Sequence, residues 1–405
     1  MKKLNELIKT LESSVSSNPS NNMKRVKKAI KDFNLSFSDI KTIHVAGTNG
    51  KGSVCKYLTE ILTDAGLKVA TFVSPYLKVF NERILLNNQN INDDDLLIYL
   101  NQILEYNDNL EEKMSFFEMI TVMAFKYFFD QAVDVMIIEV GIGGQYDVTN
   151  TLHYDLSLLT NVGTDHLDKI GPTIDDVLTN KIGILKTGGI LITTLQEEFH
   201  AKATMQAKKA NATIEFIPTA NKISNKPLIF NLFGQNFQLK MQGDFQIKNA
   251  SLAIAGVNYL FPAISYDQIK QSIAKTIWPG RFEIVSNDPT IIIDGAHNKE
   301  AALALSKAMI ELYKNENIVV IMSILKGKDH HSFINLMTTF AQEIILVDFP
   351  DPRLANLEEI SKQFKIVKHV KNIDKVFDLI KRERNIYLIT GSIHFIGYFH
   401  NLYNK

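Results

Sequence analysis

One stretch decides the fold of this chain: residues 43–53, IHVAGTNGKGS. It begins with an apolar run typical of a buried strand, and residues 54–62, VCKYLTEIL, then have the character of a helix. A triphosphate needs this arrangement, because glycines let backbone N–H groups converge on phosphate and a lysine reaches the outer phosphates from a helix N-terminus. We therefore predict an ATP-binding phosphate loop made of Gly47, Thr48, Asn49, Gly50, Lys51, Gly52 and Ser53.

The loop departs from the strict Walker A pattern, G-x-x-x-x-G-K-[ST]. Val45 stands where the first glycine belongs, and Gly52 separates Lys51 from Ser53. The prediction of a phosphate-binding loop therefore rests on the strand before the loop and the helix after it. The alternative, a flexible glycine loop without a ligand, is disfavoured by the same context.

Composition limits the classes of protein to which the chain can belong. Its 405 residues predict two domains, and 45% hydrophobic with 22% charged residues is typical of a globular protein. The 44 basic and 44 acidic residues balance, so we expect no nucleic-acid or membrane partner. The single cysteine, Cys55, excludes an intramolecular disulfide and is expected to be a small packed residue. The polar start of the chain does not resemble a signal peptide, so we expect a cytoplasmic location.

The first two thirds of the chain predict an α/β sheet that is mostly parallel. Apolar runs at 69–73, 135–140 and 156–160 look like buried strands, and residues 116–129 have helical spacing. Strand–helix alternation with right-handed crossovers places ligands at the carboxyl ends of such strands. Short strands within 213–241 are predicted to add to this sheet in antiparallel fashion. The basic run 24–31 is expected to be the solvated face of one helix.

A second α/β pattern begins near residue 289. Residues 291–293 lead into Asp294 and a helix over 299–313, and further strands are predicted at 318–322, 343–347 and 386–390. We place the boundary at 286–289. The prediction is a P-loop ATPase domain over 1–285 and a smaller, Rossmann-like α/β domain over 289–405.

Polar residues at predicted strand ends are the candidates for chemistry. Glu139 ends an apolar run, where a lone carboxylate is costly unless it is paired or binds a metal. Ser74 and His166 also follow strands and could reach a metal or a phosphate. Arg83 lies in a loop and could bind a carboxylate or phosphate in bidentate fashion. For each of these, a structural ion pair or a satisfied surface side chain is the alternative.

Three more candidates lie farther along the chain. Asn249 offers the donor and acceptor needed to read an adenine edge. Arg281 lies in a loop near the domain boundary, and Asp294 follows the first strand of the second domain, where an acid could bind ribose hydroxyls. If Arg281 and Asp294 both contact ATP, the nucleotide is held between the domains and water is excluded from the reactive phosphate.

Several stretches in order resemble the folylpolyglutamate synthase and dihydrofolate synthase family of the Mur ligase superfamily. The resemblance runs from about His44 to Gly397, nearly the whole chain. Its landmarks are HVAGTNGKGS, SPYLKVFNERI, FFEMITVMAF, EVGIGGQYDVTN, TNVGTDHLDKIGPTI, NKIGILKTGG, GDFQIKNA, WPGRFE and DGAHN. Many landmarks in one order are far more specific than a single loop.

The resemblance implies an ATP-dependent ligase that joins L-glutamate to a folate carboxylate through an acyl phosphate. It implies two Mg²⁺ ions, with Ser74, Glu139 and His166 as ligands, and it implies that Lys51, Lys181 and His166 take part in catalysis. Lys181 matches the lysine that family members carbamylate, so that its new carboxylate supports the second metal. Beyond the loop, the resemblance implies ATP contacts at Asn249, Arg281, Asp294 and His297. It implies contacts to the pterin portion of the acceptor at Phe117, Tyr146 and Asp147. We also assign Arg83 to the substrate.

The chain departs from the family pattern at three places. Gln145 stands where an arginine is common, Asn180 stands where a glutamate usually precedes the lysine, and the N-terminal pterin loop is faint in residues 20–26. A neutral amide cannot make the charged bidentate contact of an arginine, so these departures bear on acceptor specificity. They favour polyglutamylation of tetrahydrofolate over the dihydropteroate reaction.

Alternative functions remain open from the sequence. Dihydrofolate synthase activity, alone or as a second activity, keeps the chemistry and changes the acceptor. A peptidoglycan Mur ligase is disfavoured, since only 43 residues precede His44. An ATPase that makes no covalent product would have no use for Lys181 or for a pocket around Phe117. The expected partners are small molecules only, and the expected state is a monomer.

Overall fold

The computed structural model describes residues 2–403, which divide into two compact units. The first unit consists of residues up to Thr219 together with 248–273. The second consists of residues 220–247 together with the chain from Ala274 onward. Each unit has its own sheet and its own apolar core, so each is described by itself.

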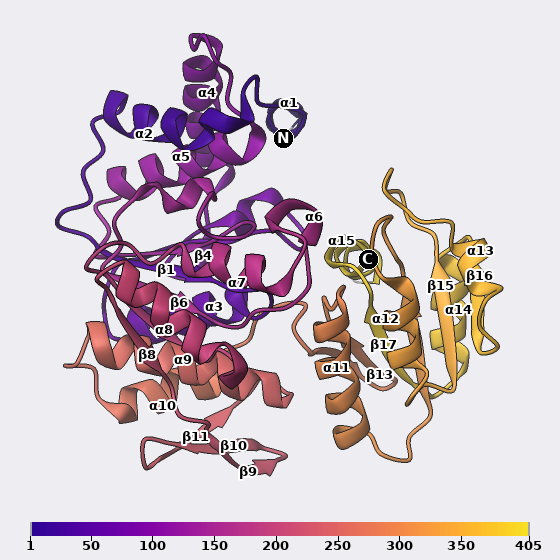
Figure 1. Cartoon of the computed structure of the whole chain (residues 1–405). Coiled ribbons are helices and arrows are strands. Elements are labelled where there is room, and N and C mark those ends of the chain that lie inside the picture. Colours follow the sequence, from indigo (N-terminus) through magenta and orange to yellow (C-terminus); the bar gives the residue numbers. More distant parts are fainter. Residues whose placement is uncertain (1, 404–405) are drawn as a thin grey trace. The chain divides into compact units, whose positions relative to one another are not determined.

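An eight-stranded sheet forms the centre of the first unit (Figure 1), in the order β4-β3-β2-β5-β1-β6-β7-β8. All neighbouring pairs from β2 to β8 are parallel, whereas β3 and β4 are antiparallel additions at one edge. The strands are β1 (Lys41–Ala46), β2 (Val69–Phe72), β3 (Ile84–Leu86), β4 (Gln89–Asn90), β5 (Val135–Glu139), β6 (Leu156–Leu159), β7 (Ile190–Thr193) and β8 (Thr213–Phe216).

The register of the central strands brings three chain segments to one edge of the sheet. Val45 of β1 is level with Glu139 of β5, and Phe72 of β2 is level with Ile138 of the same strand. The residues that follow β1, β2 and β5 therefore leave the sheet side by side. This is the carboxyl edge of a parallel sheet, where ligands of α/β folds bind.

Helices cover both faces of this sheet. The helices α1 (Lys2–Glu12), α2 (Asn22–Asp32), α4 (Asp93–Asp108) and α5 (Phe116–Asp130) form a layer over one face (Figure 1), packed on Phe72 and Ile138. Helix α3 (Lys51–Asp64) lies on the other face, since its Thr59 Oγ1 is 2.6 Å from Oγ1 of Thr71, which alternates with Phe72 along β2. The remaining helices are α6 (Leu167–Ile170), α7 (Ile174–Ile182), α8 (His200–Lys209), α9 (Asp244–Leu260) and α10 (Tyr266–Lys275).

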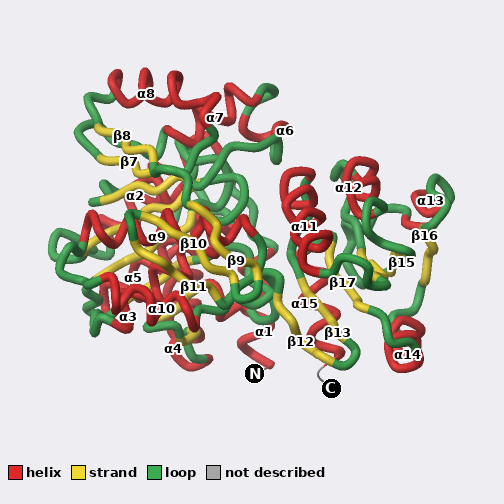
Figure 2. Tube along the Cα trace, turned by 90° about the horizontal axis from the view of Figure 1, so that it is seen from below, coloured by secondary structure: helices red, strands yellow, loops and turns green. Residues whose placement is uncertain are grey.

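The second unit has a six-stranded sheet in the order β12-β13-β17-β14-β15-β16, parallel except for β12. Figure 2 shows its strands with α11 and α12 on one side and α14 and α15 on the other. Its strands are β12 (Glu283–Asn287), β13 (Thr290–Ile293), β14 (Ile318–Met322), β15 (Glu343–Val347), β16 (Val367–Val370) and β17 (Ile386–Thr390). Its helices are α11 (Lys299–Leu312), α12 (His330–Met337), α13 (Leu357–Ser361), α14 (Asp374–Arg382) and α15 (Ile393–Tyr403).

A separate three-stranded antiparallel sheet also belongs to the second unit. It consists of β9 (Asn221–Asn225), β10 (Leu228–Leu232) and β11 (Gln235–Leu239). An ion pair of 2.7 Å between Lys222 and Glu311 joins it to α11. These strands were expected to extend the large sheet in antiparallel fashion. Only β8 joins that sheet, and it does so in parallel, because its residues continue the β7–α8 crossover.

The predicted α/β class with two domains is confirmed, but the expected boundary at 286–289 divides a hairpin. Strand β12 pairs antiparallel with β13, Ile284 with Ile292, so the second sheet begins at Glu283 and its compact unit at Ala274. The helix over 24–31 forms as part of α2, although Arg25 is buried in it and not solvated. Cys55 is buried, as expected of a small packed residue.

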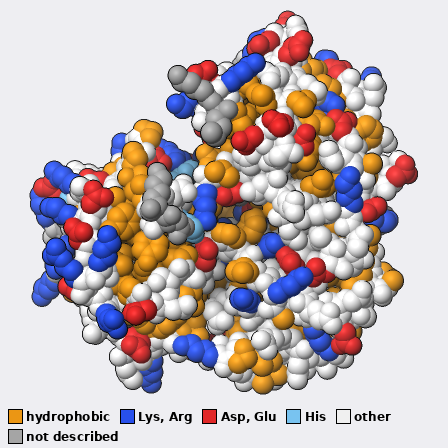
Figure 3. Space-filling model, turned by 180° about the vertical axis from the view of Figure 1, so that it is seen from behind, with side chains coloured by type: hydrophobic (Ala, Val, Ile, Leu, Met, Phe, Trp, Pro, Cys, Tyr) orange, Lys and Arg blue, Asp and Glu red, His pale blue; other side chains and the backbone are white. Residues whose placement is uncertain are grey.

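Two further features concern the helices and the surface. Within residues 2–403, the helices are all too short or too polar to cross a membrane. On the face seen in Figure 3, basic and acidic side chains are interspersed over much of the surface, in keeping with the balanced charge of the sequence.

Candidate active site

The predicted phosphate loop leaves β1 at Ala46 and enters α3 at Lys51, three residues before the expected helix start at Val54. Gly47 has φ +148°, and a Cβ on it would lie 1.8 Å from Thr160 Oγ1, so only glycine fits there. Thr160 Oγ1 donates to the Asn49 carbonyl at 2.6 Å, and Thr48 N–H donates to the Asn161 carbonyl at 3.0 Å. The end of β6 therefore holds the loop in shape. Sequence reasoning missed Thr160 and Asn161 as loop anchors, although they begin the TNVGTDH landmark.

Two lysines converge on one carbonyl of this loop. Lys51 Nζ and Lys181 Nζ donate to the Gly47 carbonyl at 3.2 and 2.9 Å. Burial, together with the positive charge of Lys51, lowers the pKa of Lys181 to about 7, whereas Asp165 and Asp147 act in the opposite direction. Burial therefore favours the neutral amine form of Lys181. The structure brings Lys181 to the phosphate loop, which no local feature of its helix would predict.

Glu139 and Ser74 come together at the ends of β5 and β2. The Ser74 N–H donates to Glu139 Oε2 at 3.0 Å, and Lys51 Nζ lies 3.9 Å from Glu139 Oε1. Glu139 is buried, with only 4% of its surface exposed. A hydroxyl and a carboxylate are hard oxygen donors, so the chemistry of this pair fits Mg²⁺. Within residues 2–403, the structure holds no cluster of three or more His, Cys, Asp or Glu side chains arranged as a metal site.

His166 lies in a loop tied to the phosphate loop. It caps α6 with a left-handed φ of +60°, and its Nε2 lies 3.8 Å from Asp165 Oδ2. Gly163 N–H of the same loop donates to Thr48 Oγ1 at 2.9 Å. The charge of Asp165 also acts on Lys181, so this loop, the second lysine and the phosphate loop form one neighbourhood.

Phe117 and Asp147 form a wall on either side of Gly141. A Cβ on Gly141 would lie 2.4 Å from Phe117 Cζ and 3.1 Å from Asp147 Oδ2. Burial raises the pKa of Asp147, while hydrogen bonds from Thr149 and from backbone N–H groups favour its ionised form. Tyr146, the third predicted pterin contact, is 66% exposed beside this wall. The structure thus brings together two of the three predicted residues and leaves the tyrosine ring in solvent.

Arg83 is buried in an aromatic cage. Its guanidinium carbon lies 4.9 Å from the ring centre of Tyr76, 5.6 Å from that of Phe80 and 5.2 Å from that of Phe116. The Nε has no hydrogen-bond partner among residues 2–403, and burial lowers the pKa of the group. Cation–π contacts offset part of the cost of burying this charge. The cage therefore offers a desolvated cation to an anionic group.

Asn249 lies against the phosphate loop, although the sequence suggested only a role at the adenine edge. Gly50 has φ +88°, and a Cβ on it would lie 2.2 Å from Asn249 Oδ1. The amide at the start of α9 is thus in contact range of the loop that turns into α3. Any side chain on Gly50 has to displace this amide.

Substituting Gly50 by alanine is therefore expected to raise the Kd of an ATP analogue by more than about tenfold, because the loop or Asn249 has to move. Gly66 offers a matched control, since it has φ +89° and nothing lies within 4 Å of its missing Cβ. G66A is expected to cost about 1–2 kcal/mol of stability from backbone strain alone, with nucleotide affinity unchanged. Equal affinity of G50A and wild type in a calorimetric titration would contradict the contact.

The second unit holds its own cluster of predicted nucleotide contacts. Asp294 is buried and accepts from Phe282 N–H and Ala296 N–H, both at 2.9 Å. Burial raises the pKa of Asp294, and the positive charge of Arg281 opposes this. A Cβ on Gly295 would lie 3.0 Å from the Arg281 guanidinium, and His297 Nδ1 lies 2.9 Å from the Gly295 carbonyl. The structure thus brings Arg281, Asp294 and His297 together around one strand-to-helix turn.

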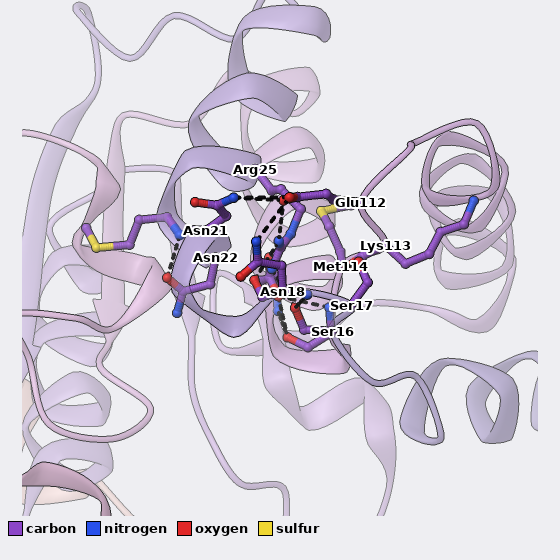
Figure 4. A network of polar contacts seen from close by, with 12 residues as sticks. Ser16, Ser17, Asn18, Asn21, Asn22, Arg25, Glu112, Lys113 and Met114 are labelled. Atoms are coloured by element: carbon purple, nitrogen blue, oxygen red, sulfur yellow. Dashed lines mark hydrogen bonds and ion pairs between the residues drawn. The ribbon is translucent and has the colours of Figure 1, made fainter.

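A network that sequence reasoning missed fixes the start of α5. Arg25 Nε donates to Glu118 at 2.8 Å. Figure 4 shows the rest of the guanidinium contacts, in which Nη1 donates to Glu112 at 3.1 Å and to the Asn18 carbonyl at 2.8 Å, and Nη2 donates to Ser16 Oγ at 2.6 Å. Arg25 and Glu118 are 6% and 1% exposed. Because Glu118 directly follows Phe117, this buried pair holds the chain N-terminal of α2 against the helix turn that carries the aromatic wall.

Two of the three departures from the family pattern, Gln145 and Asn180, lie next to each other. Gln145 N–H donates to the Asn180 carbonyl at 2.8 Å, and a Cβ on Gly183 would lie 2.4 Å from Gln145 Cβ. Asn180 Oδ1 is buried without a hydrogen-bond partner among residues 2–403. Two neutral amides thus occupy the junction between the glycine turn after β5 and the helix that carries Lys181.

Comparison with known proteins identifies the family of this chain. Residues 45–257 match the Mur ligase middle domain, and residues 280–393 match the Mur ligase glutamate ligase domain. The chain is 32% identical over 385 residues to the dihydrofolate synthase/folylpolyglutamate synthase of Bacillus subtilis, covering 88% of this chain and 89% of the relative. It is 32% identical to the folylpolyglutamate synthase of Lacticaseibacillus casei, over 76% of each chain.

A solved structure shows the same fold. The complex of E. coli FolC with DHPP and ADP superposes with a TM-score of 0.89 at 25% identity, covering 99% of this chain and 97% of that one. The family models and the B. subtilis relative both extend over most of the chain. The chain therefore belongs to the folylpolyglutamate synthase/dihydrofolate synthase family of Mur ligases, ATP-dependent enzymes that form amide bonds.

Proposed function

We propose that this enzyme adds L-glutamate to the carboxylate of a tetrahydrofolate, using ATP and an acyl-phosphate intermediate. One observation carries the proposal: the end of β5 belongs to both halves of the site. Glu139 pairs with Lys51 of the phosphate loop, and two residues later Gly141 lies against Phe117 and Asp147. A heterocycle bound at that wall thus lies near the phosphate loop, because both sites include residues at the end of β5. A two-substrate ligase needs this adjacency, whereas an ATPase without an acceptor does not.

The reaction follows from this arrangement. A carboxylate oxygen of the folate attacks the γ-phosphorus of ATP, and the bond to the β–γ bridging oxygen breaks, releasing ADP. The glutamate amine then attacks the acyl carbon, phosphate leaves with the former carboxylate oxygen, and the amine loses a proton. Lys51 and the N–H groups of residues 47–53 hold the phosphates and stabilise the charge that develops on them.

The donor set supports magnesium at this site. Ser74 and Glu139 would hold one Mg²⁺, and His166 together with Lys181 would support a second. Bound magnesium would neutralise phosphate charge. Lys181 as a cation cannot be a ligand, so the second site depends on its conversion to a carbamate. Its lowered pKa favours that conversion, because only the neutral amine reacts with CO₂.

The remaining substrate groups are assigned by charge. Arg83, buried in its cage, is proposed to bind an anionic carboxylate of the acceptor. Tyr146 is proposed to cover the heterocycle from the solvent side. Asn249 and the cluster of Arg281, Asp294 and His297 are proposed as ATP contacts of the two domains. A monomeric enzyme in the cytoplasm completes the proposal.

Dihydropteroate is a second candidate acceptor. The relatives include enzymes named for both activities, and the Arg25 network attaches residues 16–25 to the start of α5, where Phe117 lies. Dihydropteroate differs from a folate by lacking the first glutamate, so both acceptors present the same heterocycle to this wall.

ATP turnover in the presence of magnesium and glutamate tests the function, with tetrahydrofolate, dihydropteroate or no acceptor and with products weighed by mass spectrometry. The expected result is turnover that depends on tetrahydrofolate, with a mass gain of one glutamate residue. A K181M enzyme should lose ligation and keep nucleotide binding. Turnover that ignores both acceptors would contradict the function, and an active K181M enzyme would contradict the carbamate.

A further inference from the structure

A buried histidine beneath the acceptor wall has no role in the reaction described so far. His44 lies in β1, three residues before the phosphate loop, and is fully buried. Its Nε2 lies 2.9 Å from Thr149 Oγ1, and its ring stacks on Tyr154 with centroids 4.1 Å apart at 14°. Its Nδ1 has no hydrogen-bond partner among residues 2–403. A polar ring buried in this way needs a reason, because an unpaired polar atom costs stability.

The contacts fix the direction of every hydrogen bond from His44 to Asp147. Thr149 Oγ1 donates to Asp147 Oδ1 at 2.5 Å, and a hydroxyl has only one proton to give. Its lone pair must therefore accept from His44, so His44 carries its proton on Nε2. This assignment agrees with the lack of a partner for Nδ1 among residues 2–403. Nδ1 then carries no proton, so no buried N–H group of the ring is left without an acceptor. Burial lowers the pKa of His44 to about 3, so the ring is neutral near pH 7.

The same threonine donates two hydrogen bonds to one oxygen of the carboxylate. Its N–H also donates to Asp147 Oδ1, at 2.9 Å, and Ile142 N–H donates to Oδ2 at 3.0 Å. Both carboxylate oxygens thus accept from fixed donors, the pattern of an ionised group. Tyr154 completes the support, since its hydroxyl donates to the Thr149 carbonyl at 2.5 Å. Thr149 is fully buried, whereas Asp147 borders Gly141 and Phe117.

We propose that Thr149 and His44 are positioning residues that hold Asp147 as an oriented, ionised acceptor for the N–H groups of the bound heterocycle. The chain of donors runs one way, from His44 Nε2–H through the Thr149 hydroxyl to Asp147, and leaves the remaining lone pairs of the carboxylate for the ligand. The inference rests on the proposed function, in which this wall binds the pterin of the acceptor. Thr149 contributes more to the orientation of Asp147, because it donates two hydrogen bonds to the carboxylate, whereas His44 orients the Thr149 hydroxyl.

Kinetics of a T149V variant test the proposal, since valine keeps the shape and removes the hydroxyl. The KM for tetrahydrofolate is expected to rise about 10- to 100-fold, the effect of losing a hydrogen bond to a charged group, with the KM for ATP unchanged. T149S restores the hydroxyl and is expected to restore the KM. T151V is the matched control, because the Thr151 hydroxyl in the same 3₁₀ segment, η3 (Val148–Thr151), has no partner among residues 2–403.

A double-mutant cycle separates the histidine from the threonine. H44F is expected to raise the KM for the acceptor several-fold in the wild-type background and to have no further effect in T149V, because its N–H acts only through the hydroxyl. H44Q, which keeps an N–H near the position of Nε2, should lie close to wild type. Additive effects of H44F and T149V would overturn the relay.

A spectroscopic measurement tests the order of these hydrogen bonds without an activity assay. The ¹⁵N shifts of His44 in the wild-type protein are expected to show a neutral ring protonated on Nε2 at pH 7. A ring protonated on Nδ1, or an imidazolium, would overturn the proposal, as would a T149V enzyme with an unchanged KM for the acceptor or a T149S enzyme that fails to recover. Wild-type enzyme without acceptor-dependent turnover would instead contradict the proposed function, while the ¹⁵N result would still test the hydrogen-bond order.

Discussion

Replacing Lys51 by methionine is expected to lower kcat for ligation about 100- to 1,000-fold, the loss that follows removal of one preorganised charge from a transition state. Lys51 Nζ lies 3.9 Å from Glu139 Oε1 and donates to the Gly47 carbonyl at the base of the phosphate loop. Methionine keeps the length and apolar stem of the side chain, so the helix should form as before. Steady-state ADP release with saturating tetrahydrofolate and glutamate measures the effect.

Lys56 provides the control on the same helix. Its Nζ bonds Glu60 and Asn88 and has no contact with the phosphate loop in the structure. K56M should therefore retain kcat. A K51M enzyme whose kcat matches that of K56M would show that the loop does not bind the reactive phosphates through this lysine.

Replacing Arg25 by methionine is expected to cost about 3–5 kcal/mol of unfolding free energy in the first unit, because it leaves the Glu118 carboxylate buried without its cation. The pair is 2.8 Å long, and both side chains are almost fully buried. Differential scanning calorimetry of thermal unfolding measures the loss. This method is chosen because the two units need not unfold in one step. The same variant should raise the KM for the acceptor, because Phe117 is next to Glu118.

Lys28 is the matched control, since it lies one turn farther along α2 and forms an exposed ion pair with Asp32. K28M is expected to cost less than about 1 kcal/mol. The double variant R25M/E118L should recover part of the stability lost in R25M, because it removes the stranded charge and fills the space. A loss in R25M no larger than in K28M would show that the buried pair does not fix the start of α5.

Local sequence determines much of this fold. The strands predicted at 318–322, 343–347 and 386–390 are found with those bounds, because each is a continuous apolar run that can be buried on both faces of a parallel sheet. The phosphate loop is found with the expected strand before it and helix after it. Strand β8 is an edge strand with alternating exposure, so its sequence did not distinguish parallel addition from an antiparallel ribbon.

Long-range side-chain pairs account for what the sequence did not predict. Arg25 and Glu118 are 93 residues apart, and His44 and Thr149 are 105 apart, so no local spacing links them. The charge pattern of residues 24–31 predicts a solvated helix face that includes Arg25, because such patterns do not tell which cation finds a buried carboxylate. The same holds for Lys181, which local sequence places on an ordinary helix. Only the fold brings it to the Gly47 carbonyl.

Transfer of a carboxylate oxygen into phosphate tests the central claim most directly. Tetrahydrofolate labelled with ¹⁸O in its terminal carboxylates is incubated with enzyme, ATP, magnesium and glutamate, and the released phosphate is examined by mass spectrometry. An acyl-phosphate ligase must deliver one labelled oxygen to phosphate for each amide bond formed. Labelled phosphate in step with the glutamylated product is the predicted result. Unlabelled phosphate would contradict activation of the folate carboxylate by ATP and, with it, the assignment of this site.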